Sequence, residues 1–257
     1  MKKFKISHVI SIITIIFCVA YLIFGQGIRM HNKLKNMDYD KANEITKGFK
    51  SYAMTIDTIL TLDGKDGKKQ NAMTQKIELD DSIYKVSTEV TTTDVTNGAV
   101  SMQENSYMYH LNNYYYDYPG VKYKSPITKA EAMANLTNLA NIISFDYSQM
   151  ADLTKEYDDK NKCVTFHFTI GYEDVSEHVK TLLQSAAQTF KGVNFKPVDI
   201  FASATVNDAK IVTERDLYIE YEGDGGESIV IEIYTSLAES SPHLTAPNDS
   251  EYVNIEE

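Results

Sequence analysis

The chain has 257 residues, a formal net charge of −11 and two cysteines, Cys18 and Cys163. Six of the 25 Lys and Arg residues precede Asp38, while all 36 acids lie at or beyond it, so the chain from Asp38 onward carries about −17. This charge argues against a nucleic-acid partner and against a protein that lies flat on anionic lipid. Solubility is the simplest role of so many acids, and cation binding is the alternative.

The apolar run Ile6–Gly25 predicts a membrane-spanning helix. Twenty residues at about 1.5 Å each reach about 30 Å, the thickness of a bilayer core. Lys2, Lys3 and Lys5 precede the run, and the positive-inside rule places them in the cytoplasm. We therefore expect residues 1–25 to be an uncleaved single-pass anchor in the cytoplasmic membrane, with the N-terminus inside and the following domain outside.

Cleavage and lipidation are the two alternatives to an uncleaved anchor. The stretch Phe24–Gly27 resembles a weak signal-peptide cleavage site. Lipidation at Cys18 is disfavoured, because Phe17 is large where such sites need a small residue. With Cys18 in the membrane, only Cys163 remains outside and no internal disulfide can form. Export without disulfides is common in Gram-positive bacteria, and we expect such a host.

Residues 26–37 are expected to be a short stalk, and residues 38–238 an extracytoplasmic α+β domain. Helical spacing of apolar residues predicts a helix over Asp40–Tyr52. Alternating apolar residues, separated by turns rich in Asp and Gly, then indicate an antiparallel meander. Its first strands are predicted over Tyr52–Leu62, Met73–Leu79 and Ile83–Val90.

The segment Tyr107–Tyr118 predicts a β-hairpin rich in tyrosine. Asn112–Asn113 suits a two-residue turn, because Asn tolerates positive φ. One face of the hairpin then carries five tyrosines and a leucine. That face is either an ordinary half-buried sheet face or an aromatic wall that faces a ligand. The predicted pairs are Leu111 with Tyr114, Tyr109 with Tyr116 and Tyr107 with Tyr118.

Beyond the hairpin the periodicity changes to that of helices. Thr128 and Glu131 fit a capping box, and apolar spacing predicts a helix over Thr128–Ser144. A second amphipathic helix is predicted over Asp174–Phe190, and residues 239–257 are expected to be a polar tail. The predicted order is helix, about six strands, helix, one or two strands, helix and three strands. The later strands are predicted over Lys162–Ile170, Val198–Val206, Ile211–Tyr221 and Ser228–Thr235.

No pattern of catalytic residues is visible. None of the histidines has another His or a Cys at ligand spacing, and Cys163 has no His nearby in the sequence. The acid pairs fall at predicted turns or at a helix start, where Asp and Glu have local roles. There is no calcium loop and no glycine-rich phosphate loop. We expect no metal, no cofactor and no enzymatic activity.

The layout resembles the bacterial lipoprotein-carrier superfamily typified by LolA and by LppX/LprG-type lipoproteins. The resemblance spans about residues 40–250 and rests on the order of elements. It implies an unclosed, strongly curved antiparallel half-barrel whose helices lie on the concave side, where acyl chains are held. The elements that carry it are the helix leading into Tyr52–Leu62, the Tyr-rich segment Ser106–Tyr118, the central helix, the run Lys162–Ile200 and the close Leu244–Pro247.

Two functions follow as expectations. The first is a membrane-anchored extracytoplasmic binding protein for a lipid or another apolar small molecule. The alternative is a ligand-free interaction or sensing module for a cell-envelope protein partner. A tethered chain cannot shuttle freely, so the first function would be local binding. The expected apolar wall consists of Tyr107, Tyr109, Leu111, Tyr114, Tyr116, Tyr118, Leu136, Ile143, Phe166, Phe168, Leu182 and Leu183.

Overall fold

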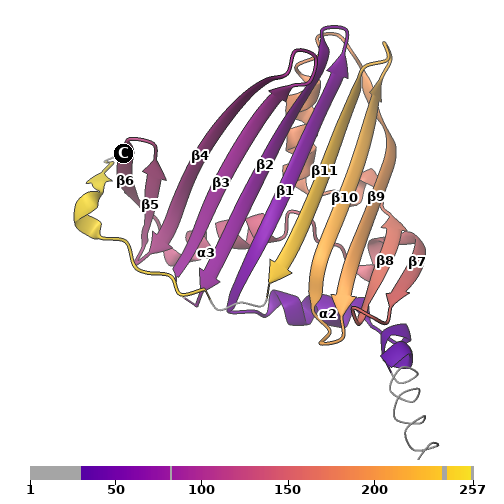
Figure 1. The fold of residues 1–257 in the computed structure, drawn as a ribbon, viewed down its shortest axis with the longest axis horizontal. Helices are drawn as coiled ribbons and strands as arrows, with labels where there is room; N and C mark the ends of the chain where they lie inside the picture. The colour runs from indigo at the N-terminus through magenta and orange to yellow at the C-terminus, as the bar shows by residue number, and fades with distance from the viewer. Residues whose placement is uncertain (1–29, 82, 239–241, 256–257) are drawn as a thin grey trace, which may run out of the picture.

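An open sheet of twelve strands dominates the computed structural model, which describes residues 30–81, 83–238 and 242–255. Helices α3 and α4 lie behind the sheet in Figure 1, and α2 crosses the lower end of β10 and β11. The strand order is β12-β6-β5-β4-β3-β2-β1-β11-β10-β9-β8-β7, so β12 and β7 are separate edges and the sheet does not close. Every neighbouring pair is antiparallel except β12 with β6.

The elements follow one another in the predicted order, with six strands before α3, two before α4 and the three predicted strands after it; the short β12, in the expected polar tail, is a fourth that was not predicted. In chain order the helices and strands are α2 (Tyr39–Lys47), β1 (Ser51–Gly64), β2 (Gly67–Asp80), β3 (Ile83–Asp94), β4 (Ala99–His110), β5 (Asn113–Tyr118), β6 (Val121–Pro126), α3 (Lys129–Ala140), β7 (Ala151–Asp158), β8 (Cys163–Thr169), α4 (Glu177–Ala187), β9 (Phe195–Asn207), β10 (Val212–Gly223), β11 (Ser228–Ala238) and β12 (Val253–Asn254).

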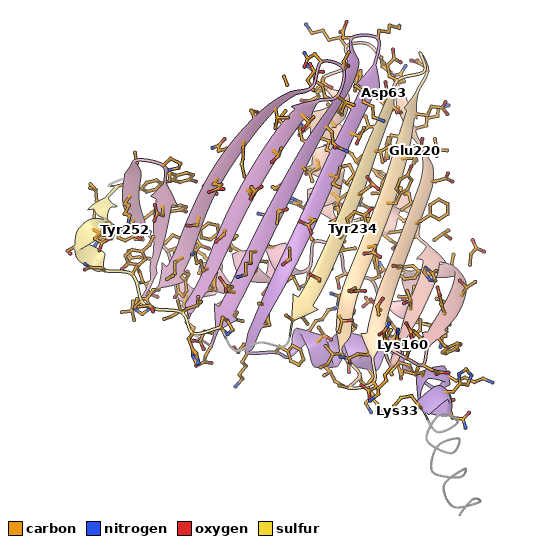
Figure 2. All side chains as sticks on the ribbon, viewed as in Figure 1. Lys33, Asp63, Lys160, Glu220, Tyr234 and Tyr252 are labelled. Carbon is orange, nitrogen blue, oxygen red and sulfur yellow. The ribbon has the colours of Figure 1, made fainter. Side chains whose placement is uncertain are left out.

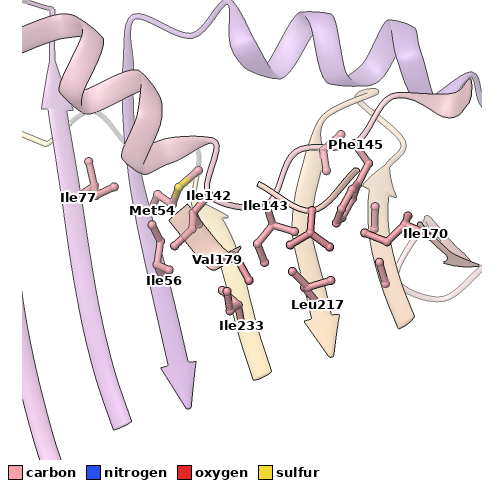
Figure 3. Close-up of a cluster of buried hydrophobic side chains, with 14 of the residues drawn as sticks. Met54, Ile56, Ile77, Ile142, Ile143, Phe145, Ile170, Val179, Leu217 and Ile233 are labelled. Atoms are coloured by element: carbon pink, nitrogen blue, oxygen red, sulfur yellow. The ribbon is translucent and has the colours of Figure 1, made fainter. Parts of the chain in front are cut away.

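The sheet buries one face under the helices. In β1, residues Tyr52, Met54 and Ile56 are buried while the residues between them are only partly so, as alternation along a strand requires. The same alternation in β8 to β11 buries apolar side chains on this face, among them Phe166, Ala204, Leu217 and Ile231. Ile142 and Phe145, in the segment that follows α3, are buried between the helices and the strands (Figure 3).

Each helix is shorter than the spacing predicts, because side-chain caps and turn residues end it early. Thr128 caps α3, with its backbone N–H and side chain bonded reciprocally to Glu131, as predicted. Ser176 caps α4, so the predicted start at Asp174 falls instead in a 3₁₀ turn. Gly48 follows α2, and Tyr52 is already part of β1.

The register predicted for the tyrosine hairpin is wrong. Leu111 and Asn112 form the turn with φ of 44° and 61°, so Tyr109 pairs with Tyr114 rather than with Tyr116. Two adjacent residues of positive φ match the right-handed twist of the strands, and Asn112 supplies one of them readily. The tyrosines keep their common face, because their pairing shifts by two residues. Leu111 leaves the predicted wall and is 74% exposed in the turn.

Both described ends of the chain pack on the domain. Residues 30–35 are helical, and Leu34 and Met37, expected in the stalk, belong to the buried core. Near the other end, β12 pairs with β6, while Asp249 accepts hydrogen bonds from Tyr115 and Lys124. None of the described helices is long and apolar enough to cross a bilayer. Ile6–Gly25 lies outside the described residues, so the anchor remains a prediction.

Candidate functional site

A cavity of about 260 Å³ lies between the helices and the sheet. Its helical side comes from the C-terminal parts of α2 and α3, and its other side from β1, β2, β10 and β11. The lining residues are Thr46, Lys47, Phe49, Tyr52, Met54, Leu79, Met133, Leu136, Thr137, Ala140, Asn141, Arg215 and Leu237.

Most of the lining is apolar. Tyr52, Met54 and Leu79 project from β1 and β2 on the face that the helices cover, and all three are buried. Leu136 approaches from α3 and is buried as well. Phe49, Met133 and Leu237 are partly buried and pack against the same core. An apolar tail would therefore find hydrophobic contacts on both the sheet side and the helix side.

Arg215 is the exception in this lining. It occupies a core-facing position of β10 and is only 4% exposed. One guanidinium nitrogen, Nη2, donates to Asn43 Oδ1 at 2.8 Å, while Nε has no hydrogen-bond partner among the described residues. Asn43 is itself held by donation to Phe145 O at 3.2 Å. The guanidinium is thus fixed in place with donor capacity left over.

Tyr39 of α2 lies close to the same guanidinium. Burial raises the pKa of the Tyr39 hydroxyl, and the positive charge of Arg215 lowers it in part. Asp146 and Asp40 add smaller upward contributions to that pKa. Tyr39 therefore lies within electrostatic range of the Arg215 guanidinium.

Thr46 attaches α2 to the sheet beside the cavity. Its hydroxyl donates to Ala42 O at 2.8 Å and accepts from Val212 N at 2.9 Å, where a register irregularity interrupts the pairing of β10 with β9. The bond satisfies an N–H that the irregularity leaves without a strand partner. It also fixes the end of α2 relative to Arg215.

The mouth of the cavity is formed by exposed residues at the ends of the two helices. Lys47 in the last turn of α2 and Thr137 in α3 are exposed, and Asn141 beyond α3 is partly buried. The buried floor consists of Tyr52, Met54 and Arg215. The lining contains two cationic side chains and, among the described residues, no Asp or Glu.

The structure separates most of the predicted wall from this cavity. Of the twelve predicted residues only Leu136 lines it. Ile143, Phe166, Phe168 and Leu183 are buried in the core, and Leu182 is partly buried against it. Tyr109 and Tyr114 are buried, Tyr107, Tyr116 and Tyr118 are partly buried, and Tyr118 stacks on Tyr116 and Tyr123.

The buried tyrosines form a hydrogen-bonded part of the core. Asn135 Nδ2 donates to the Tyr114 hydroxyl at 3.2 Å, which lies 2.6 Å from the Tyr84 hydroxyl. Tyr84 in turn donates to Ala132 O at 2.9 Å, so Tyr114 donates to Tyr84. Burial raises the pKa values of Tyr84 and Tyr107. These side chains join the hairpin to α3 rather than leaving room for a ligand.

A second hollow lies on the face of the sheet away from the helices, which faces the viewer in Figure 2. This groove of about 400 Å³ includes Phe201, Tyr218 and Tyr234, with Phe201 49% and Tyr234 41% exposed. Asp152 and Asp216 also line it. Burial and the hydrogen bond to Glu220 raise the pKa of Tyr218 to about 12. The groove is therefore both aromatic and acidic.

The sequence contains a signal for Arg215 that hydrophobic patterning overlooks. Arg215 shares its strand face with Leu217, Ile219 and Tyr221, so a charged residue stands where alternation requires an apolar one. Such a residue at a core-facing position predicts either a buried partner or a ligand. Asn43, Phe49 and Lys47 show no comparable signal, because their position near Arg215 depends on the docking of α2.

No family model matches the chain, and no curated protein matches it. Among solved structures, the crystal structure of LprF from Mycobacterium bovis is similar over 86% of this chain and 96% of that chain. The sequence identity is 10% and the TM-score 0.33. The likeness is thus a weak one, limited to the level of the fold.

Proposed function

We propose that the protein binds a single-chain apolar ligand in the cavity between α2, α3 and the sheet. The observation that carries this proposal is the lining, in which Tyr52, Met54, Leu79 and Leu136 present apolar surface to the hollow. An apolar ligand there would displace water from these side chains and gain dispersion contacts with them.

The size of the cavity sets the size of the ligand. About 260 Å³ is slightly below the range of roughly 300–1,000 Å³ that drug-sized ligands occupy. One short alkyl or acyl chain fits this volume, and a lipid with several chains does not fit whole. The exposed mouth at Lys47 and Thr137 lets the remainder of a larger molecule extend outward.

The proposal is for a binding protein without a catalytic step, on the outer side of the cytoplasmic membrane. Support for binding comes from the lining, in which apolar side chains outnumber polar ones. Support for the location comes from the apolar run Ile6–Gly25 and the lysines before it. A tether at this position would keep the cavity close to the membrane that supplies lipids.

Photolabelling of the full chain in nanodiscs tests the proposal. The probe is a dodecyl alcohol that carries a diazirine, and labelled peptides are mapped by mass spectrometry. We expect labels on α3 and β1, and we expect Ala140→Trp to reduce them by about tenfold or more because the indole fills the cavity. Ala134→Trp, at an exposed position of α3, is the matched control. Equal labelling of both variants would reject the cavity as the binding site.

The alternative function, docking of an envelope protein, is favoured by a different feature. The groove around Phe201, Tyr218 and Tyr234 exposes aromatic rings beside Asp152 and Asp216, a combination that suits Lys or Arg side chains of a partner segment. Under this alternative a cross-linker at position 201 captures one partner in membranes, and Asp216→Asn with Tyr234→Ser abolishes the product.

A further inference from the structure

We infer that the ligand of the cavity is an amphiphile with an anionic head group, a carboxylate or a phosphate ester, which the Arg215 guanidinium binds. This inference rests on the proposed function and names the chemical class of its ligand. It follows from the state of Arg215, from the charges around the cavity and from the geometry of a guanidinium.

Arg215 is a buried cation without a counterion among the described residues. None of the ion pairs formed by those residues includes it. The groups that face its guanidinium are neutral, the Asn43 oxygen that accepts from Nη2 and the Tyr39 hydroxyl beside it. Removal of a charge from water is costly unless an opposite charge and hydrogen bonds compensate. The described residues therefore supply no negative charge to compensate Arg215, and an anion in the cavity would supply it.

The orphaned donor indicates the kind of anion. Nε of Arg215 is buried and has no partner among the described residues, while Nη2 is already used by Asn43. A guanidinium presents its donors as a planar fork that matches the two oxygens of a carboxylate or phosphate.

The charges at the mouth favour an anion as well. Lys47 adds a second cation to the lining, which contains no described acid although the whole chain carries −11. The C-terminal ends of α2 and α3 oppose this, each with roughly half a negative charge that acts within about one turn. Two full cations against two such ends leave a net positive charge of about one.

The shape of the site separates head from tail. Arg215 is buried at the floor beside β10, and the apolar side chains Met54, Leu79 and Leu136 line the same space. A head group at Arg215 and a tail along α3 would satisfy both parts of the lining. A free inorganic anion would satisfy only the guanidinium, and a hydrocarbon only the apolar part.

Competition experiments test the inference with the full chain in phosphatidylcholine nanodiscs. Unlabelled dodecanoate, dodecyl phosphate, dodecanol and dodecyltrimethylammonium compete with the diazirine-bearing dodecyl alcohol. We expect the two anions to displace the probe at concentrations about tenfold or more below that of dodecanol, and the cation to displace it least. The stronger of the two anions then identifies the source, a fatty acid or a phosphate-bearing lipid.

Substitutions of Arg215 identify the group responsible. Arg215→Met is expected to abolish the preference for anions. The concentration of dodecanol that displaces the probe should change by less than about threefold. Arg215→Lys should keep part of the preference, since it keeps the charge but loses the fork. Lys47→Met should reduce the preference less, and Lys50→Met, which alters an exposed residue outside the lining, should leave it unchanged.

The outcomes separate the inference from the proposed function. If no alkyl compound competes, the proposed function fails. If dodecanol competes as well as dodecanoate, or if the anion preference survives in Arg215→Met, the inference is overturned while the function stands. Glu239 follows the lining residue Leu237 by two positions and lies outside the described residues, so its role as a counterion of Arg215 is tested by substitution. A melting temperature lowered equally by Glu239→Gln, by Arg215→Met and by both together would mean that the chain supplies its own counterion, and this too would overturn the inference.

Discussion

At the scale of single residues, the buried hydroxyl groups of the tyrosine cluster depend on one another. Tyr84 accepts from Tyr114 and donates to a backbone carbonyl of α3, so its hydroxyl connects β3, β5 and the helix. A neutral phenol satisfies both bonds, whereas a phenolate could not donate to Ala132 O. The protonated state of this side chain is therefore part of the native core.

Stability should fall at alkaline pH because of these tyrosines. Burial raises the pKa of Tyr84 above its unfolded value of about 10, so the native state favours the protonated form. The contribution is fully present below about pH 10 and is lost as the pH rises above it, at up to about 1.4 kcal/mol per pH unit. We expect Tyr84→Phe to make the free energy of unfolding fall less steeply between about pH 10 and 12.

Urea unfolding measured at several pH values checks this expectation. The substitution itself should cost about 0.5–1.5 kcal/mol at neutral pH, through the lost hydrogen bonds. Parallel pH profiles for the wild type and Tyr84→Phe would contradict the assignment of the alkaline loss to this hydroxyl.

At the scale of elements, α4 shows how well spacing alone predicts a buried face. Val179, Leu183 and Ala186 are buried, and Leu182 is only partly so. The amphipathic spacing of Asp174–Phe190 predicts that all four lie on the apolar face of one helix. In the structure Leu183 lies in the buried face of α4 and Leu182 is only partly buried. The helix packs on β11 through a narrower face than the apolar spacing predicts.

The two leucines should therefore differ in their effect on stability. Leu183→Ala should lower the free energy of unfolding by about 2–5 kcal/mol, since it removes a buried side chain. Leu182→Ala should cost less than half as much, because the side chain is partly solvated. Chemical denaturation of both variants measures the difference. Equal losses would mean that the helix is rotated from the position described.

The hairpin β4–β5 shows where sequence reasoning fails for an element. The sequence predicted the hairpin and its tyrosine face, and both are present. It could not fix the turn, because Asn112 tolerates positive φ in either of two positions and the choice depends on pairing along the whole sheet. The cavity was missed for a related reason. Asn43 and Arg215 form a hydrogen bond although 172 positions separate them in the sequence. Periodicity predicts which face of a helix or strand is buried, but it does not predict a cavity between elements.

At the scale of the whole molecule, the proposed membrane location rests on the N-terminal run Ile6–Gly25. Ile13→Arg or Ile16→Arg should each disfavour membrane insertion by about 2.5–3.5 kcal/mol near the helix centre. We expect these variants to remain in the cytoplasm, where fractionation and added protease would detect them.

The control for this experiment is Ile45→Arg, which places the same charge on an exposed position of α2 and should leave the location unchanged. Wild-type protein in the culture medium, with a new N-terminus near Gln26 or Gly27, would show instead that the segment is a cleaved signal.

The position of β1 in the sheet has a consequence for the folding of the chain. β1 pairs with β2, which follows it directly, and with β11, which is nearly the last strand of the chain; Leu60, for example, lies opposite Ile231. Strands β1 to β6 can assemble as successive hairpins as they emerge, and so can β7 to β11. The seam between the halves cannot form until β11 is available to β1, and the entropy of closing so long a loop slows its formation further. Until then β1 and β11 expose unpaired backbone groups, which can pair with other chains. Protection against aggregation during folding would therefore be needed most at this seam.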